Sequence, residues 1–326
     1  MKKKAISSLL SCSLLFSGAL VSAQEQAQES SSVSGTIGLG ALIINSGNNL
    51  NPKGSEERLD NLQSGADRET TVIPPILVNA VWDVGEAEGM KLYLSTTPPI
   101  DEVGGFTIDM GGSYRLPEVG IFEGSFFVSP FAKVYENPYL VGVNRIETDT
   151  TKFGAQVGLN RIMGSGLRVK FIYLNDDVDD DVIGALEPTL ARDGSVYVLN
   201  MNYSFYPTDT LEIRPRVGVH FGDYDGQANS YTKYKLSLEA RYTLDKVMIV
   251  PRVYYSHSDY DEEHPVFDQT RENDGYGISL MTTYMAPFNF KNWSTTALVS
   301  LSKGDSNIDF FDTEAVTIGG FINYRF

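Results

Sequence analysis

Basic side chains recur at alternate positions in several segments of this 326-residue chain. In a β-strand, residues two apart point to the same face, so each such pair would present two positive charges side by side. Arginine and lysine in that arrangement bind carboxylate and phosphate groups, and they attract small anions into an enclosed aqueous space. The candidate residues are Arg168, Lys170, Arg214, Arg216, Lys233, Lys235, Arg241 and Arg252.

The elements that carry these residues have a period of two. In "TLEIRPRVGVHF", Leu211, Val217 and Phe221 fall on one face, and Arg214 and Arg216 fall on the other. Such alternation is typical of strands with one apolar and one polar face. The predicted strands are 33–44, 71–84, 89–96, 104–116, 124–135, 151–162, 166–175, 194–206, 210–221, 231–244, 247–258, 275–286, 292–302 and 314–326.

The links between these strands alternate between short turns, such as "MGSG", and long polar loops, such as residues 45–70. A soluble sandwich would explain the two faces of each strand, but not this alternation of link lengths. Aromatic residues near the strand ends and strands of roughly ten residues favour a barrel in a bilayer. We therefore predict an all-β fold, a transmembrane up-and-down antiparallel β-barrel of about 14 strands, with 12 as the alternative, and a periplasmic N-terminus.

The first residues indicate export. Three lysines, a short apolar stretch and the small residues before Gln24 predict a secretory signal peptide at 1–23. A short periplasmic segment at 24–32 would follow, and then the barrel at 33–326. Cys12 is the only cysteine, so the processed chain would hold neither disulfides nor thiolate metal sites.

Charge and hydropathy exclude further classes. Loss of residues 1–23 removes three lysines and no acid, which takes the formal net charge from −16 to −19. Such an acidic chain is not expected to bind nucleic acid. No segment approaches eighteen consecutive apolar residues, so we expect no transmembrane helix.

The last residues, "IGGFINYRF" (318–326), continue the alternation to a final phenylalanine. They resemble the C-terminal signature of outer-membrane β-barrel proteins of Gram-negative bacteria. That resemblance implies that the barrel-assembly machinery reads Phe326, Tyr324 and Ile322, and that the partners include the lipid bilayer and lipopolysaccharide in the cell outer membrane. Within this class the chain resembles an uncharacterised porin-like family known only as a domain of unknown function.

Three functions fit a barrel of this kind. A porin-like channel would let small, preferably anionic, solutes diffuse along the basic lumen. Alternatively, the basic residues pair with acids such as Glu212 and Glu239 and fill the interior, because small barrels are filled by side chains. A non-conducting barrel would serve as a receptor or adhesin through acidic external loops, with the 45–70 loop either folded over the mouth or exposed. The oligomeric state stays open.

A hydrolase ranks lowest of the three. The histidines are His220, His257 and His264, interpreted as surface residues in ordinary roles. Ser256 and Ser258 flank His257 but would point to the opposite face of a strand, whereas Asp259 or Asp261 could orient it. No nucleophile elbow, zincin or P-loop motif occurs, so we expect no enzyme, no catalytic residue and no cofactor.

Two acidic runs, "NDDVDDD" (175–181) and "DYDEEH" (259–264), are predicted to lie in loops. Clustered aspartates could bind calcium, but the EF-hand pattern is absent, so a solvated surface is the favoured interpretation and no metal site is predicted.

Three segments repeat a proline on the apolar face, at Pro130, Pro215 and Pro251, with Lys133, Arg216 and Arg252 predicted to face inward. Strand prolines are typical of bulges, which we favour over a role in shaping the lumen.

Overall fold

The computed structural model describes residues 33–84, 89–96 and 106–326. The predicted signal peptide and the 24–32 segment lie outside the described residues. The strands are β1 (Val33–Gly47), β2 (Glu69–Ile73), β3 (Ile76–Asp83), β4 (Met90–Ser95), β5 (Ile108–Leu116), β6 (Gly120–Tyr135), β7 (Glu147–Asn160), β8 (Leu167–Val178), β9 (Gly194–Tyr203), β10 (Phe205–Thr208), β11 (Leu211–Tyr224), β12 (Tyr231–Leu244), β13 (Val247–His264), β14 (Gln269–Met285), β15 (Trp293–Ser306) and β16 (Thr313–Arg325).

The helical segments are short and lie in the links between strands. They are the helix α1 (Val182–Leu186) and 3₁₀ turns at Ile162–Gly164, Pro188–Leu190, Gln227–Asn229, Pro287–Asn289 and Asp309–Phe311. Within the described part of the chain, no helix has the length and hydropathy to cross a membrane.

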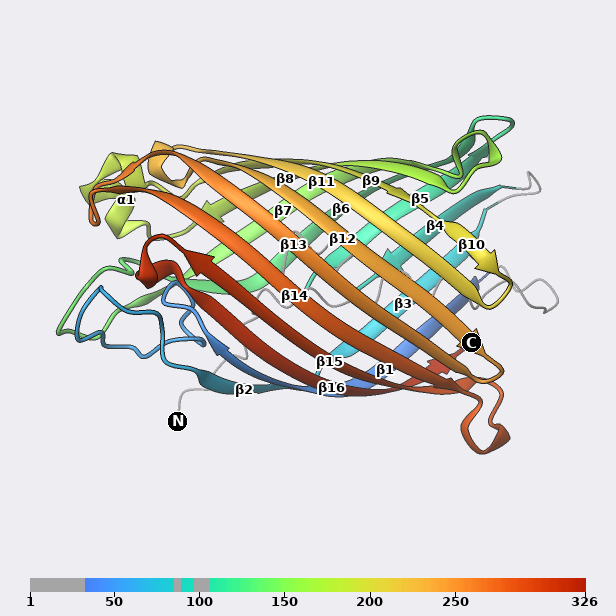
Figure 1. Ribbon diagram of the computed structural model, residues 1–326. Helices are drawn as coiled ribbons and strands as arrows, with labels where there is room; N and C mark the ends of the chain where they lie inside the picture. Colours follow the sequence, from blue (N-terminus) through green and yellow to red (C-terminus); the bar gives the residue numbers. More distant parts are fainter. Residues whose placement is uncertain (1–32, 85–88, 97–105) are drawn as a thin grey trace.

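The strands form one closed antiparallel sheet (Figure 1). Both β2 and β3 pair with β1, and both β9 and β10 pair with β11, so each couple acts as a single interrupted strand. The sixteen strand segments of the described chain therefore form a barrel of fourteen strands. This confirms the predicted 14-stranded up-and-down barrel, and the alternative count of 12 is wrong.

The final strand closes the barrel. β16 pairs with β1 in a register that places Thr36 opposite Arg325, and Gly35 and Phe326 exchange two backbone hydrogen bonds of 3.0 Å. The apolar C-terminus is thus ordered because its backbone groups complete the ladder, leaving no open edge in the hydrocarbon.

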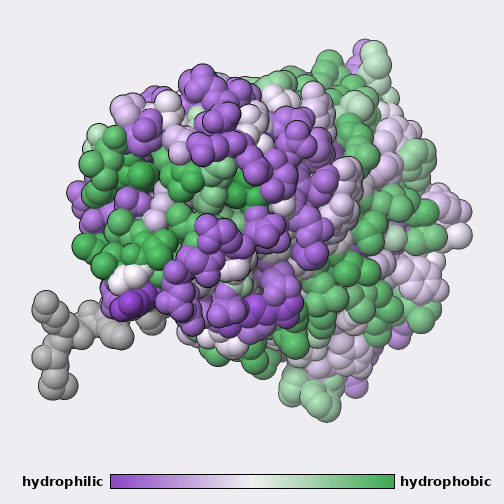
Figure 2. All heavy atoms as spheres, turned by 60° about the vertical axis from the view of Figure 1, so that its left-hand side comes forward, coloured by the Kyte–Doolittle hydropathy of each residue, from purple (hydrophilic) through white to green (hydrophobic). Residues whose placement is uncertain are grey.

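The apolar faces of the strands point outward, as predicted. Val217 and Leu236 are 43% and 55% exposed, whereas Arg214 on the alternate face is largely buried and ion-paired. Outward-facing rings pair near the strand ends: Trp293 with Tyr324, with ring centroids 5.1 Å apart, is one example. Figure 2 shows broad hydrophobic areas along the barrel side and hydrophilic side chains gathered over the end with the long loops. This is the arrangement of a transmembrane barrel.

Several strands extend further than predicted. β13 continues to His264, and its pairing with β14 reaches His264 opposite Gln269. The "DYDEEH" run therefore lies in a strand, and its prediction as a loop was wrong. Similarly, residues 175–178 of "NDDVDDD" belong to β8, and β6 begins at Gly120, four residues before the prediction. Backbone pairing does not require apolar side chains, so hydropathy alone misses strand ends that project into water.

One of the three repeated prolines lies at a bulge. Pro130 lies in a register shift between β6 and β7, whereas β11–β12 and β13–β14 keep one register through Pro215 and Pro251. Proline cannot donate to the ladder, so bulges are its natural place in a sheet. The shift beyond Pro130 also reverses the facing of Lys133, which lies opposite Asp149 and contacts Glu147 at 3.4 Å. Its predicted inward orientation was wrong.

Candidate functional site

The inner face of β8 to β13 carries the predicted basic residues. Strand register places Arg168 and Arg216 opposite Asn202 of β9 from either side, and Lys170 opposite Asn200. Consecutive antiparallel strands are neighbours in space, so these side chains share one surface. We call this surface the basic wall, formed by Arg168, Lys170, Arg214, Arg216, Lys233, Lys235, Arg241 and Arg252.

The lower part of the basic wall, near the short turns, is an ion-pair network. Arg214 lies 2.6 Å from Glu212 and 3.1 Å from Glu239, and Arg241 lies 3.3 Å from Glu212. The cross-strand register pairs Glu239 with Arg214 on one side and with Arg252 on the other. The alternative of internal pairing is thus realised for two arginines of the wall.

The upper part of the basic wall faces neutral partners across the ladder. Lys235 lies opposite Ser256 and Gly218, and its Nζ atom lies 5.3 Å from the centroid of the Tyr254 ring. Lys233 lies opposite Ser258 and His220. Eight basic residues form the wall, against the two glutamates of the network and the nearby Glu123 and Asp109, which act electrostatically on Arg168 and Lys170. The wall therefore carries an excess of positive charge although the chain as a whole is acidic.

A second inner surface was missed by the sequence analysis. Leu42, Val250, Met281 and Leu298 point inward and are 1–2% exposed. The signal was present, because Val250 alternates with the outward Pro251 and lies two residues from Arg252. Inward positions were searched for charge and not for apolar side chains.

The long loops pack together into a structure that we call the loop cap, comprising residues 48–68, 136–146, 179–193, 225–230, 265–268 and 307–312. Leu50, Leu59 and Leu62 of the 45–70 loop pack against a cluster that contains Phe310 and Phe311. Backbone bridges also join Arg58 to Asn144 and Leu59 to Val141. The 45–70 loop is therefore part of a folded cap with its own apolar core.

An aromatic residue links the two halves of the cap core. Tyr139 packs against Ile183 and Leu190 on one side and against the phenylalanine cluster on the other. Desolvation raises the pKa of Tyr139 to about 12. Its hydroxyl lies 2.9 Å from Nε2 of His264.

Two arginines, the buried Arg145 and the partly buried Arg192, tie the cap segments to one another. Arg145 donates to the carbonyl oxygens of Asn49 (2.7 Å), Pro138 (3.1 Å) and Glu56 (2.5 Å), and its guanidinium lies 3.8 Å above the Tyr135 ring. Burial lowers the pKa of Arg145 from its usual value. These bonds join the 45–70 loop to residues 135–146.

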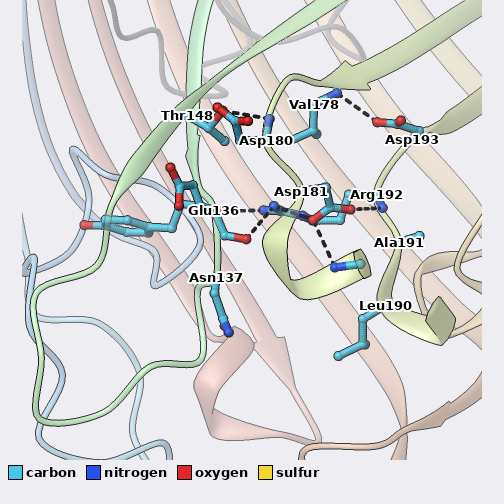
Figure 3. Close-up of polar contacts among 12 residues, drawn as sticks. Glu136, Asn137, Thr148, Val178, Asp180, Asp181, Leu190, Ala191, Arg192 and Asp193 are labelled. Carbon is cyan, nitrogen blue, oxygen red and sulfur yellow. Dashed lines mark hydrogen bonds and ion pairs between the residues drawn. The ribbon is translucent and has the colours of Figure 1, made fainter. Parts of the chain in front are cut away.

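Arg192 makes the second connection (Figure 3). It donates to the carbonyl oxygens of Tyr135 (2.7 Å) and Glu136 (3.1 Å), and its Nε donates to Asp181 at 2.7 Å. The Asp181 carboxylate also accepts from the backbone of Gly184 and so caps α1.

The acidic run 175–181 is thus only partly a solvated surface. Asp181 is used in this network, and Asp176 pairs with Lys152 at 2.7 Å. The interpretation as a solvated surface was wrong for these two residues. In the described ranges, no cluster of three or more histidine, cysteine, aspartate or glutamate residues could hold a metal ion.

The histidines are not all surface residues, so that prediction was wrong. His220 and His264 are 4% and 0% exposed. His257 faces outward, and its ring nitrogens lie 3.0 Å from Asp259 and from Asp274. Ser256 and Ser258 point to the opposite face, as their position in a strand requires.

The terminal residues proposed as the assembly signal lie on the outer surface. Ile322, Tyr324 and Phe326 are 56%, 38% and 44% exposed. The Phe326 ring lies close over Gly35, where a Cβ atom would collide with it. An assembly partner would therefore meet these side chains on the lipid-facing side.

Comparison with solved structures returns bacterial outer-membrane barrels at low identity. The outer membrane channel DcaP of Acinetobacter baumannii is 9% identical, with 90% of this chain and 96% of that chain covered and a TM-score of 0.45. A Pseudomonas aeruginosa FadL homologue is 12% identical, with 90% and 89% covered and a TM-score of 0.44. The CymD monoaromatic hydrocarbon channel is 10% identical, with 92% and 90% covered and a TM-score of 0.47.

No curated protein matches the chain. A family profile described as "Protein of unknown function (DUF2860)" matches residues 32–325, which includes all sixteen strand segments of the barrel. The predicted resemblance to a family known only as a domain of unknown function is thereby confirmed. The chain belongs to the DUF2860 family.

Proposed function

We propose that this protein is a channel of the Gram-negative outer membrane through which small, anionic solutes diffuse passively. The observation that carries the proposal is the excess positive charge of the basic wall inside a barrel with an apolar exterior. Positive charge along a pore lowers the barrier for anions and raises it for cations. Residues 1–23 would direct export and be removed, and insertion into the outer membrane would bring lipopolysaccharide and the barrel-assembly machinery into contact with the chain.

The strand number supports a conducting interior only in part. Barrels of eight strands are filled by side chains, and those of sixteen to eighteen enclose an aqueous channel. A barrel of fourteen strands lies between these two cases. Arg214 and Arg241 are ion-paired in the lower part of the wall, whereas the upper wall faces serine, glycine and asparagine across the ladder.

The test is current through the purified protein in a planar bilayer. With potassium chloride at unequal concentrations, the reversal potential should lie close to the equilibrium potential of chloride, because the basic wall disfavours cations. Heat-denatured protein in the same detergent gives the background. Absence of current would remove the channel proposal, and cation preference would remove the role given to the basic wall.

The loop cap favours a second candidate, a receptor or adhesin that acts through its external surface. A packed core and the hydrogen bonds of Arg145 and Arg192 give the cap a defined shape. A binding surface requires a defined shape, which loops that are only solvated do not have. The acids of the 259–264 run contribute to that surface from the exposed end of β13 instead of from a loop. Proteolysis of whole cells that abolishes ligand or phage binding but leaves conductance intact would favour this candidate.

A further inference from the structure

The core of the loop cap encloses a histidine that has no role in the proposed channel. His264, the last residue of β13, is 0% exposed. Its ring packs against the rings of Tyr139, Phe267 and Phe311, with centroids 5.0, 5.0 and 5.3 Å away. These three rings come from three different segments of the cap. His264 therefore lies where the cap segments meet.

The hydrogen bonds of His264 fix its ring in the neutral form. The backbone N–H of Val266 donates to Nδ1 at 3.3 Å, so Nδ1 carries no proton. A neutral imidazole then bears its proton on Nε2, which donates to the Tyr139 hydroxyl at 2.9 Å. A second proton would have to bind Nδ1, where it would face the N–H of Val266 and break that hydrogen bond.

A buried cation lies beside this ring. Arg271 of β14 is 7% exposed, and its guanidinium lies 3.5 Å from the centroid of the Tyr260 ring and 4.2 Å from that of Phe311. Phe311 thus contacts both Arg271 and His264. Among the described residues, no carboxylate pairs with Arg271 or His264, and Nε of Arg271 has no hydrogen-bond partner. A proton on His264 would place a second positive charge in an aromatic core that already holds one.

The other groups around the ring do not compensate for that charge. The acids on the elements that pack here, Glu263, Asp268 and Asp309, are exposed to solvent. Tyr139, whose pKa is raised to about 12 by burial, stays neutral and offers no negative charge near neutral pH.

The closed cap therefore binds this proton weakly. Burial away from water and, after it, the charge of Arg271 lower the pKa of His264 from its ordinary 6.5 to about 4. When the cap opens, water surrounds the ring and the ordinary pKa returns. Protonation then favours the open cap, because the open cap takes up the proton at a higher pH than the closed one.

We propose that the loop cap is acid-sensitive: its core closes around a neutral His264 and opens when that ring takes up a second proton. The closed cap has its full stability above about pH 6.5 and loses it as the pH falls toward about 4. A buried histidine at the junction of several segments is a known kind of switch between two arrangements. This switch lies in the loops and does not require that the barrel conduct.

The experiment is hydrogen exchange, followed by mass spectrometry, on the whole barrel in detergent micelles at pH 8 and pH 5. The reporters are the amides of Gly142 and Arg145, which donate to the carbonyl oxygens of Leu59 (2.8 Å) and Glu57 (2.7 Å) and so join two cap segments. Each exchange rate is divided by the intrinsic rate of that amide at the same pH, which leaves the equilibrium constant for opening. Protection of these amides should fall about thirtyfold from pH 8 to pH 5, as the two pKa values of His264 require. Amides of the β14–β15 ladder should keep their protection.

The variant His264→Gln should abolish this response, because glutamine takes up no proton but can still donate to the Tyr139 hydroxyl. His220→Gln and His257→Gln are the matched controls. They remove the other two histidines of the chain and should respond to pH as the wild type does. Arg271→Met keeps His264 but removes the neighbouring charge, so its protection should fall less than that of the wild type.

A thirtyfold fall in the wild type and in both controls, absent from His264→Gln, supports the acid-sensitive cap. Equal protection of the wild type at the two pH values, or the wild-type fall in His264→Gln, overturns it. If the cap of His264→Gln is unprotected even at pH 8, Arg271→Met decides: a smaller fall supports the switch, and an unchanged fall overturns it. Loss of protection that extends to the β14–β15 ladder would mean general unfolding and would also overturn it. Absence of current in a planar bilayer removes the channel proposal and leaves this switch standing.

Discussion

The arginines of the loop cap and those of the barrel interior make different kinds of contact. In the loop cap, Arg145 and Arg192 donate mostly to backbone carbonyl oxygens of other segments. In the barrel, Arg214 and Arg241 face the carboxylates of Glu212 and Glu239 on the same and neighbouring strands. The backbone of the barrel is already satisfied by its ladder, whereas the loops have few such bonds of their own.

The difference predicts what the removal of each arginine should change. A cap arginine holds chain segments that nothing else fixes, so its removal should loosen structure. A lumen arginine sits on a frame that the ladder fixes, so its removal should change the field inside the barrel and little else. The following substitutions test this distinction.

The largest effect is expected for Arg145→Ala. The change leaves the carbonyl oxygens of Asn49, Pro138 and Glu56 without their donor and removes the contact with Tyr135. Unsatisfied buried groups of this kind cost about 3 kcal/mol, or roughly a hundredfold in the open population of the cap. Proteinase K cleavage of the 45–70 loop should accelerate by that factor. Arg58→Ala, an exposed residue of the same loop, should cleave at the wild-type rate.

The next largest effect is expected on the ion selectivity of the pore. Arg214→Glu combined with Arg216→Glu replaces two positive charges of the basic wall with two negative ones. The anion preference should fall about tenfold, while the barrel keeps its heat-modifiable electrophoretic mobility. Arg161→Glu with Lys291→Glu makes the same change at the exposed turns and controls for net charge. An unchanged reversal potential would mean that the basic wall does not border the solute path.

A smaller structural effect is expected for Arg192→Lys. Lysine keeps the charge but not the planar fork that reaches Tyr135, Glu136 and Asp181 together. Loop cleavage should accelerate about tenfold, corresponding to roughly 1.4 kcal/mol. Equal protection in the variant would show that charge alone holds these segments.

The smallest effect is expected for Glu239→Gln. Loss of one carboxylate makes the lumen more positive and removes one partner of Arg214. Anion preference should rise about twofold without a change in proteolysis. Glu262→Gln, which lies on the exposed end of β13, is the matched control. If proteolysis of the variant accelerated instead, the ion pairs inside the barrel would have the structural role that we assign to the arginines of the cap.

The barrel was predictable because its signals are local. The alternation of apolar and polar residues shows which face Leu211, Val217 and Arg214 occupy. The lengths of the turns and loops indicate that consecutive strands are neighbours in the barrel. Lys133 was assigned to the wrong face because a register shift beyond Pro130 reverses the alternation, and hydropathy carries no trace of a bulge. The inward apolar side chains of Val250 and Leu298 could have been found from the alternation, but their position beside Met281 depends on the register between strands.

The sequence by itself determined the fold class, the number of strands and the inner position of the basic residues in strands without a bulge, since each follows from neighbours along one strand. Tertiary structure decided which charges pair, how far the strands run beyond the apolar band, and how the loops fold into a cap. Those features depend on contacts between residues such as Arg145 and Asn49, ninety-six positions apart. Such contacts are fixed only when closure of the barrel brings the loops to one end.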